Sequence, residues 1–338
     1  MQVIASYYQV FQQVSRLVLT ILSWYLLCAK VSIYYSGAIN MHYVTLKQGR
    51  LGAVINNHLI DIDAASSILG LAVPCFDMWS LLDSPQSIQD DFDALVQTAY
   101  EQHIACVSYT PELVGSPLPH LRRNVFCIGK NYADHAAEIA HKMGISADLP
   151  KYPIVFSKAT NTLIGPLENI PLHAGVTRKI DYEGELALVI GKAGVNISKQ
   201  DAWRHVFGFS CYNDVSARDL QKRHSQWHLG KCLDGFGPMG PAITPTYGRP
   251  LSDDSRLTCR VNGELRQDAT IAQMIFDIPT IISTLSAGIT LEVGDVIATG
   301  TPAGVGMGFN PMRFLEPGDK VEVTITGTLP LTNHLAFT

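Results

Sequence analysis

The sequence has little charge and no closely spaced cysteine pair, and each absence removes a class of protein. Among its 338 residues only 16% are Asp, Glu, Lys or Arg, the formal net charge is −5, and no cluster of Lys or Arg occurs. Nucleic-acid-binding proteins usually carry a basic stripe, so no nucleic acid is expected as a partner. Because 47% of the residues are hydrophobic, the chain can bury a full globular core.

The seven cysteines are odd in number, widely separated, and form no C-x-x-C pair. A disulfide framework and a zinc knuckle are therefore not expected, and a reducing, cytoplasmic location is the default. Cys127, Cys211 and Cys232 lie near the motifs described below, but we interpret them as small buried thiols rather than nucleophiles.

Near the N-terminus, the stretch 17-LVLTILSWYLLCA-29 is an apolar run of 13 residues in which no charge occurs before Lys30. A membrane-spanning helix needs about 20 apolar residues, and only a segment that tolerates Lys30 and covers 17–36 approaches that length. No convincing signal-peptide cleavage site follows. Residues 1–40 are thus either an extension upstream of a fold that begins near Met41, for example from a mis-set start codon, or a membrane anchor or targeting segment.

From Met41 onward the apolar pattern predicts a small β-meander over 41–62 and helices between about 63 and 107. Three prolines mark a linker near 110–120. Short strands are expected beyond it at 124–129, 153–157, 184–191, 206–214, 240–244, 257–262, 296–299 and 320–326, and helices at 132–143 and 271–287, the second interrupted near Pro279. Strands dominate without regular alternation with helices, so the expected fold class is α+β, predominantly β. We expect a small N-terminal subdomain at 41–118 and a larger domain at 119–338.

Carboxylates crowd one end of an apolar strand in the stretch 181-DYEGELALVI-190. Asp181, Glu183 and Glu185 are spaced two apart, so in a strand their side chains share one face. Asp214 ends a second apolar strand. Carboxylates that converge from two strands suit Mg²⁺, Mn²⁺ or Ca²⁺ better than zinc.

Glu183, Glu185 and Asp214 are therefore the expected metal ligands. Asp181 is expected either to support them or to be solvated. The alternative is that all these acids are solvated or paired with basic residues nearby, such as Arg218 and Lys222.

Three further segments contain residues suited to catalysis. In 128-IGKNYADHAAEIA-140, His135 and Glu138 lie one helical turn apart, so the carboxylate can orient an imidazole that takes a proton from water; surface helices often contain such pairs by chance. In a Gly-rich, aromatic segment, Lys231 can stabilise a carbonyl or enolate, or simply be solvated. The stretch 299-TGTPAGVGMG-308, with Thr301, can hold a carboxylate in an anion nest or form a plain turn, and it lacks the GK[ST] ending of a P-loop.

Taken together, five motifs in this order resemble the fumarylacetoacetate hydrolase family over about residues 120–330: N-Y-x-x-H-x-x-E, D-Y-E-x-E-L, N-D-V-S-A-R-D-x-Q, L-G-K-C-L-D-x-F-G-P-M-G-P and G-D-V-I-A-T-G-T-P-A-G-V-G. Residues 41–110 resemble the N-terminal part of bacterial members, and 1–40 have no counterpart. The resemblance implies a mixed β-sandwich roll, a homodimer and a divalent metal, mostly Mg²⁺. One departure is Cys232, where serine is more usual.

The resemblance also implies a role for each matching residue. The metal ligands would be Glu183, Glu185 and Asp214, the water-activating pair His135 and Glu138, the active-site lysine Lys231, and the substrate contacts Arg218, Gln221 and Thr301.

The activity that this resemblance implies is a metal-dependent hydrolysis of a C–C bond in an acylpyruvate-type (2,4-dioxo acid) substrate. The alternatives on the same platform are isomerisation of a 2-hydroxydienedioate, decarboxylation of an oxaloacetate-like acid, and a lyase step on ureidoglycolate. His135 and Glu138 favour hydrolysis, because decarboxylation and isomerisation need no activated water. A non-catalytic binding protein, tethered through 17–36, is a different class of interpretation that the filled catalytic positions disfavour.

Overall fold

The structure, a computed structural model, describes residues 41–71, 77–143 and 148–337. The extension expected at 1–40, with its candidate anchor at 17–36, lies outside the described residues. Among the residues that are described, no helix combines the length and the apolar character that a membrane span needs.

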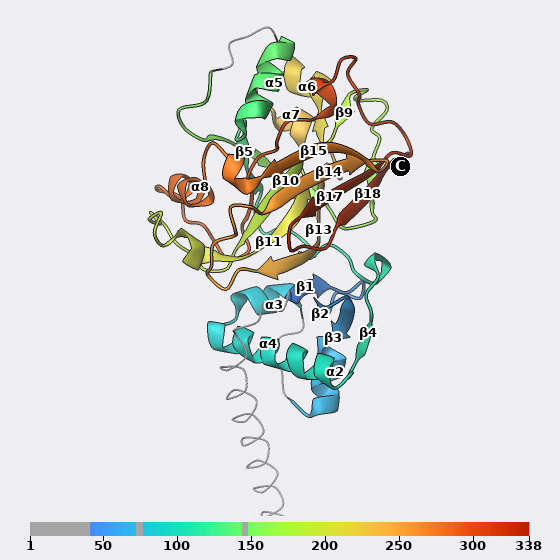
Figure 1. The fold of residues 1–338 in the computed structure, drawn as a ribbon, viewed down its shortest axis with the longest axis vertical. Coiled ribbons are helices and arrows are strands. Elements are labelled where there is room, and N and C mark those ends of the chain that lie inside the picture. The colour runs from blue at the N-terminus through green and yellow to red at the C-terminus, as the bar shows by residue number, and fades with distance from the viewer. Residues whose placement is uncertain (1–40, 72–76, 144–147, 338) are drawn as a thin grey trace, which may run out of the picture.

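An eleven-stranded sheet forms the centre of the fold (Figure 1). Its strands are, in spatial order, β4 (Cys106–Ser108), β3 (His58–Asp61), β2 (Leu51–Ile55), β1 (Met41–Thr45), β13 (Gly237–Pro245), β11 (Val206–Asn213), β10 (Gly184–Ile190), β16 (Val296–Ala298), β5 (Val125–Gly129) and β6 (Ile154–Lys158), and β7 (Leu163–Ile164) pairs with β13. The predicted meander is β1–β3. It joins the larger domain through antiparallel pairing of β1 with β13, in which Tyr43 lies opposite Ile243.

A five-stranded sheet packs on one face of this central sheet. It consists of β15 (Glu264–Thr270), β14 (Arg256–Val261), β17 (Lys320–Ile325), β18 (Leu331–Ala336) and β8 (Asn169–Pro171). From β10, Leu186 and Leu188 point into the core between the two sheets, whereas Ala187 and Val189 point into a second core on the opposite face. Strand β10 is thus buried on both faces, which explains why its apolar run is continuous rather than alternating.

Helices lie at three places in the molecule (Figure 1). The helices α2 (Ile62–Leu69), α3 (Met78–Asp83) and α4 (Gln86–Glu101) cover the N-terminal strands, α5 (Ala133–Met143), α6 (Arg218–Arg223) and α7 (His228–Lys231) gather at the opposite end, and α8 (Ile278–Leu285) lies at one side. The single-turn 3₁₀ helices are η1 (Pro111–Leu113), η2 (Thr160–Thr162), η3 (Ala202–His205), η4 (Ile271–Gln273) and η5 (Gly306–Gly308).

The predicted fold class is confirmed, since the protein is a mixed fold with more strand than helix and with open sheets. The helix predicted over 271–287 is wrong in its first part. Residues 271–273 form only the turn η4, and α8 begins at Ile278. Pro279 lies in the first turn of α8, where its missing N–H costs nothing, and Asp277 caps the helix by accepting a hydrogen bond from the Thr280 N–H.

Candidate active site

Three carboxylates meet where two central strands lie side by side. Glu183 directly precedes β10, Glu185 is its second residue, and Asp214 directly follows β11. The strands pair antiparallel with Gly184 opposite Asn213, so the start of one adjoins the end of the other. One oxygen of each acid lies within 4.8 Å of the others, and all three side chains are buried. The structure thus brings together the residues predicted as metal ligands.

Asp181 does not join this cluster, because it does not lie on the strand that carries Glu185. Asp181 belongs to the short strand β9 (Ile180–Asp181), which pairs with β12 (Ser216–Ala217) instead. Its carboxylate accepts hydrogen bonds from the N–H groups of Gly306, at 2.7 Å, and Met307, at 3.0 Å. Asp181 therefore lies beside the three acids and is fully buried rather than solvated.

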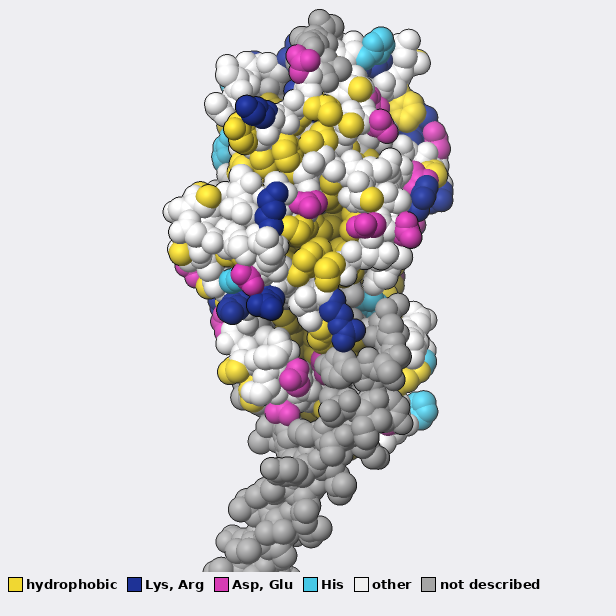
Figure 2. Space-filling view, turned by 60° about the vertical axis from the view of Figure 1, so that its left-hand side comes forward, with side chains coloured by type: hydrophobic (Ala, Val, Ile, Leu, Met, Phe, Trp, Pro, Cys, Tyr) yellow, Lys and Arg dark blue, Asp and Glu magenta, His cyan; other side chains and the backbone are white. Residues whose placement is uncertain are grey.

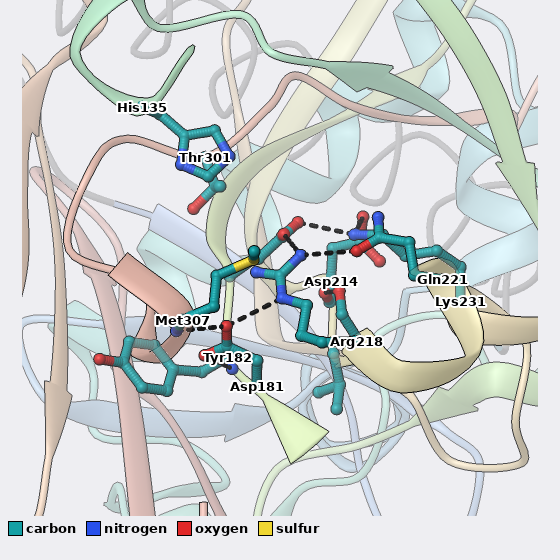
Figure 3. A network of polar contacts seen from close by, with 12 residues as sticks. His135, Asp181, Tyr182, Asp214, Arg218, Gln221, Lys231, Thr301 and Met307 are labelled. Carbon is teal, nitrogen blue, oxygen red and sulfur yellow. Dashed lines mark hydrogen bonds and ion pairs between the residues drawn. The ribbon is translucent and has the colours of Figure 1, made fainter. Parts of the chain in front are cut away.

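Two of the predicted basic residues form ion pairs with the buried acids. Lys231 Nζ lies 2.7 Å from Glu183 Oε2 and 2.6 Å from Asp214 Oδ2. Arg218 bridges two acids, with Nε at 2.8 Å from Asp181 Oδ2 and Nη1 at 2.7 Å from Glu183 Oε1. Arg218 lies between Asp181 on one side and Lys231 on the other (Figure 3). The interpretation that these acids pair with Arg218 is therefore correct for Asp181 and Glu183.

Sequence reasoning missed one member of this network, Lys158, the last residue of β6. Its side chain is completely buried, and Nζ donates to Asp214 Oδ1 at 2.6 Å and to the Val215 carbonyl at 2.9 Å. A lysine that closes an apolar strand is a weak signal of such a role, since buried lysines nearly always have a charged partner. Its partner is 56 residues away in the sequence, so no local pattern identifies it.

Glu185 is the acid of this cluster that forms no ion pair with a described Lys or Arg residue. Burial, followed by the neighbouring Asp214 and Glu183 carboxylates, raises the pKa of Glu185 well above its usual range. Burial acts on Glu183 in the same direction, but Lys231 and then Arg218 outweigh it and lower the pKa of Glu183 to about 2. Three buried carboxylates with an uncompensated charge are a donor set that fits a hard divalent cation.

Helix α5 carries the predicted His–Glu pair. His135 Nδ1 lies 3.4 Å from Glu138 Oε2, which is longer than an ordinary hydrogen bond. That nitrogen is buried and has no hydrogen-bond partner among the described residues. Glu138 instead accepts the Gly304 N–H, at 3.1 Å and 3.3 Å from its two oxygens. The pair is thus an electrostatic contact, and Glu138 is positioned mainly by the loop that faces it.

The Gly-rich loop 299–308 does bind carboxylates, but they belong to the protein itself. Besides Gly304, which binds Glu138, the Gly300 N–H donates to Glu185 Oε2 at 2.9 Å. The N–H groups that hold Asp181 also come from this loop. The predicted anion nest therefore holds three side chains of the site.

Thr301 is positioned differently from the expected substrate contact. Its hydroxyl donates to the Gly184 carbonyl at 2.9 Å and accepts from Gln267 Nε2 at 2.7 Å. The one hydroxyl proton of Thr301 is thus already used to hold the start of β10. The side chain still lies at the cavity, on the same side of the network as His135 (Figure 3).

A cavity of about 450 Å³ opens onto these residues. Of the predicted site residues, those that line it are His135, Glu183, Glu185, Arg218, Gln221, Lys231 and Thr301. Asp214 and Glu138 are not among the lining residues and support the site from behind its wall. Gln221 accepts a hydrogen bond from Arg218 Nη1 at 3.1 Å. The substrate-facing positions inferred from the sequence thus share one cavity with two of the three clustered acids.

Comparison with known proteins assigns the chain to a family. The family model described as "Fumarylacetoacetate (FAA) hydrolase C-terminal" matches residues 124–336. The chain belongs to the fumarylacetoacetate hydrolase family. The family inferred from the five motifs is thereby confirmed.

Individual members of the family resemble the chain over most of its length. "Oxaloacetate tautomerase YisK" of Bacillus subtilis is 50% identical over 220 residues, which cover 65% of this chain and 72% of the relative. The solved fumarylacetoacetate hydrolase from Exiguobacterium antarcticum is 35% identical, with a TM-score of 0.67, over 88% of this chain and 100% of that one. The 2-hydroxyhepta-2,4-diene-1,7-dioate isomerase from Mycobacterium marinum is 36% identical, with a TM-score of 0.56, over 67% of this chain and 78% of that one.

Proposed function

We propose that the protein is a divalent-metal-dependent tautomerase or isomerase of a 2-oxo acid, and that oxaloacetate is the first substrate to test. The observation that carries this proposal is the buried cluster of Glu183, Glu185 and Asp214, whose excess charge opens onto a cavity of substrate size. Relatives named as an oxaloacetate tautomerase and a dienedioate isomerase support this choice over hydrolysis. Mg²⁺ is the proposed metal, with Mn²⁺ and Ca²⁺ as alternatives.

The chemistry requires one proton to move between carbon 3 and the oxygen on carbon 2 of the substrate. A cation bound by the three acids would supply Lewis acidity to that oxygen. The ammonium group of Lys231 lies at the same acids and stabilises negative charge that develops on the enolate. His135 lines the cavity and has a ring nitrogen without a hydrogen-bond partner among the described residues. We therefore assign it the proton transfer.

Hydrolysis of an acylpyruvate is the second candidate, and the His135–Glu138 pair is the observation that favours it. The two side chains lie one helical turn apart, with His135 lining the cavity and Glu138 behind it, as expected of a base and the carboxylate that orients it. Against it, Glu138 accepts a backbone N–H rather than the imidazole proton. The homodimer and the boundary between residues 118 and 119 stay predictions beside either activity.

The test is a set of turnover assays on the full chain with Mg²⁺ and with EDTA. Oxaloacetate enol is followed by its ultraviolet absorbance, pyruvate release reports decarboxylation, and acetylpyruvate and a 2-hydroxydienedioate are measured in parallel. We expect metal-dependent enol–keto exchange without pyruvate release. E185Q should lose this activity, and E292Q, a change at an exposed position, should retain it. Metal-dependent cleavage of acetylpyruvate alone would establish the hydrolase. Mg²⁺ binding without turnover of any substrate would indicate a binding protein.

A further inference from the structure

One wall of the cavity is aromatic and has no part in the chemistry described above. Phe156 of β6 and Trp227, which directly precedes α7, both line the cavity. Their rings meet edge to face, with centroids 5.2 Å apart and planes at 75°. Lys231 Nζ lies 5.3 Å from the centroid of the Phe156 ring. The aromatic wall therefore begins directly beside the lysine that contacts the acidic cluster.

Gly129, the last residue of β5, makes room for this wall. A Cβ atom at Gly129 would lie 2.6 Å from Cζ3 and 2.9 Å from Cη2 of Trp227, whereas carbon atoms pack at about 3.5–4.0 Å. The indole thus rests directly on the backbone of a central strand. Because that backbone is buried in the sheet, a side chain at position 129 could be accommodated only if the indole moved.

The cavity is larger than a four-carbon 2-oxo acid requires. One water molecule occupies about 30 Å³ in the liquid. If each non-hydrogen atom of a substrate is given that same volume, the nine such atoms of oxaloacetate occupy about 270 Å³. The cavity measures about 450 Å³. A substrate of about twelve non-hydrogen atoms, which needs about 360 Å³ by the same measure, fits the space and reaches beyond the acids.

Much of the cavity wall is apolar, and most of the charged side chains in it outside the acidic cluster are basic. Ile139 of α5, Met307 of η5 and Phe314 line the cavity as well as Phe156 and Trp227. Four lysines also line the cavity: Lys130, Lys142, Lys179 and Lys222. On the face shown in Figure 2, apolar side chains likewise form a broad surface with Lys and Arg side chains beside it. An anionic substrate with an apolar body matches this combination, because the lysines attract the charge and the wall buries the body.

We propose that the same site tautomerises arylpyruvates, with phenylpyruvate as the simplest example. This inference rests on the proposed function, since it uses the same cation and proton transfer. In the step, a C3–H bond breaks, the electron pair forms the C2=C3 double bond, and the former carbonyl oxygen gains the proton. No oxidant, reductant or water is consumed. The aryl ring would lie against Trp227 and Phe156 while the 2-oxo acid faces the acidic cluster.

The experiment measures enolisation of phenylpyruvate and oxaloacetate by the full chain with Mg²⁺, in parallel. We expect kcat/KM for phenylpyruvate to lie within about 10-fold of the value for oxaloacetate. W227L removes part of the apolar wall against which the ring would lie, so it should lower kcat/KM for phenylpyruvate by about 10-fold or more relative to oxaloacetate, mainly through KM. G129A should act in the same direction. L229A is the matched control, because Leu229 lies on α7 with 51% of its surface exposed and does not line the cavity.

The outcomes separate this inference from the proposed function. The arylpyruvate assignment would be overturned, and the tautomerase left intact, if oxaloacetate reacts while phenylpyruvate neither reacts nor inhibits competitively. A W227L variant with an unchanged ratio of the two substrates would also overturn it. A strong preference for a seven-carbon dioate over phenylpyruvate would show that the lysines, rather than the aromatic wall, select the substrate. If neither oxaloacetate nor phenylpyruvate reacts, the proposed function itself fails.

Discussion

Lys158 and Asp214 form an ion pair in which both side chains are completely buried, with Nζ 2.6 Å from Oδ1. The other oxygen of Asp214 is bound by Lys231, also at 2.6 Å. Each oxygen of this carboxylate thus has its own lysine. The four acids in and beside the cluster face three buried cations, so one negative charge is in excess. The acids are Asp181, Glu183, Glu185 and Asp214, and the cations are Lys158, Arg218 and Lys231.

Replacing Lys158 with methionine should make the folded protein strongly dependent on metal. Breaking a buried ion pair costs about 3–5 kcal/mol, so K158M is expected to lower the melting temperature without metal. Because a second negative charge is then uncompensated, Mg²⁺ should raise the melting temperature more in K158M than in the parent chain. Thermal unfolding with and without Mg²⁺ measures both effects. K158R, which keeps the charge, is the control, and an unchanged Mg²⁺ response in K158M would contradict the prediction.

Replacing Glu185 with glutamine should have the opposite effect on stability. When folding raises the pKa of a carboxyl group, the folded protein becomes less stable as pH rises through that pKa. Ionised Glu185 therefore destabilises the metal-free protein at neutral pH. E185Q is therefore expected to raise the metal-free melting temperature by about 2 °C or more and to abolish its increase with Mg²⁺. Differential scanning calorimetry checks this, with E292Q as an exposed control. A metal-free E185Q protein less stable than the parent would argue against electrostatic repulsion in the cluster.

Gly308 offers a way to displace Glu138 without changing its chemistry. A Cβ atom at Gly308 would lie 1.9 Å from Glu138 Oε1, so G308A must displace the carboxylate from its position between His135 and Gly304. We expect turnover to fall by about 10-fold or more, since a positioned acid–base group contributes at least that much. G175A is the control, because no atom lies within 4 Å of a Cβ there. Steady-state kinetics at equal concentrations of folded protein measure this effect. A G308A variant with the same turnover number as the parent would contradict the prediction.

His42 should make the protein unstable in mild acid. Burial lowers the pKa of His42 to about 4, and its Nδ1 lies 2.8 Å from Thr244 Oγ1 across β1 and β13. As pH falls, His42 binds a proton first in the unfolded state, where its pKa is near 6.5. The contribution of neutral His42 to the free energy of unfolding is therefore complete above about pH 6.5, and about 3 kcal/mol of it is lost as pH falls to 4. Urea unfolding of the parent and H42Q across that range measures the difference. H58Q, at the half-exposed His58, is the control. If the free energy of unfolding of H42Q depends on pH as strongly as that of the parent, the assignment is refuted.

Much of the site was predictable because its residues interrupt local patterns. Glu183 and Glu185 stand out where an apolar strand begins, and Asp214 stands out where another ends. Lys158 and Gly129 could not be found in this way, because their roles depend on Asp214 and Trp227, which lie far along the chain. Nothing in either local stretch distinguishes a buried lysine from a solvated one, or a glycine under an indole from a glycine in a turn.

The fold shows the same division between local and distant causes. Strands with apolar runs, such as β10, were predicted close to their true bounds. Strand β15 was missed because its sequence, ELRQDAT, has almost no apolar alternation and is held by pairing with β14. The strands β9 and β12 each have two residues and exist only because they pair with each other. The hydrogen bonds that Thr301 forms with Gly184 and Gln267 could not be predicted either, because both partners lie far away in the sequence.

The loop 299–308 has a consequence for how members of this family can diverge. It holds Glu138, Asp181 and Glu185 through main-chain N–H groups, which every amino acid except proline supplies. Three of the four donors are Gly300, Gly304 and Gly306, where a Cβ atom would lie 2.7 Å or less from a neighbouring atom, so replacements that keep the acids in place are confined to the non-glycine positions of the loop. Insertions or deletions, by contrast, would shift all three anchor points at once. Single replacements at positions such as Met307, which lines the cavity, can thus alter substrate preference while the acidic cluster is inherited intact.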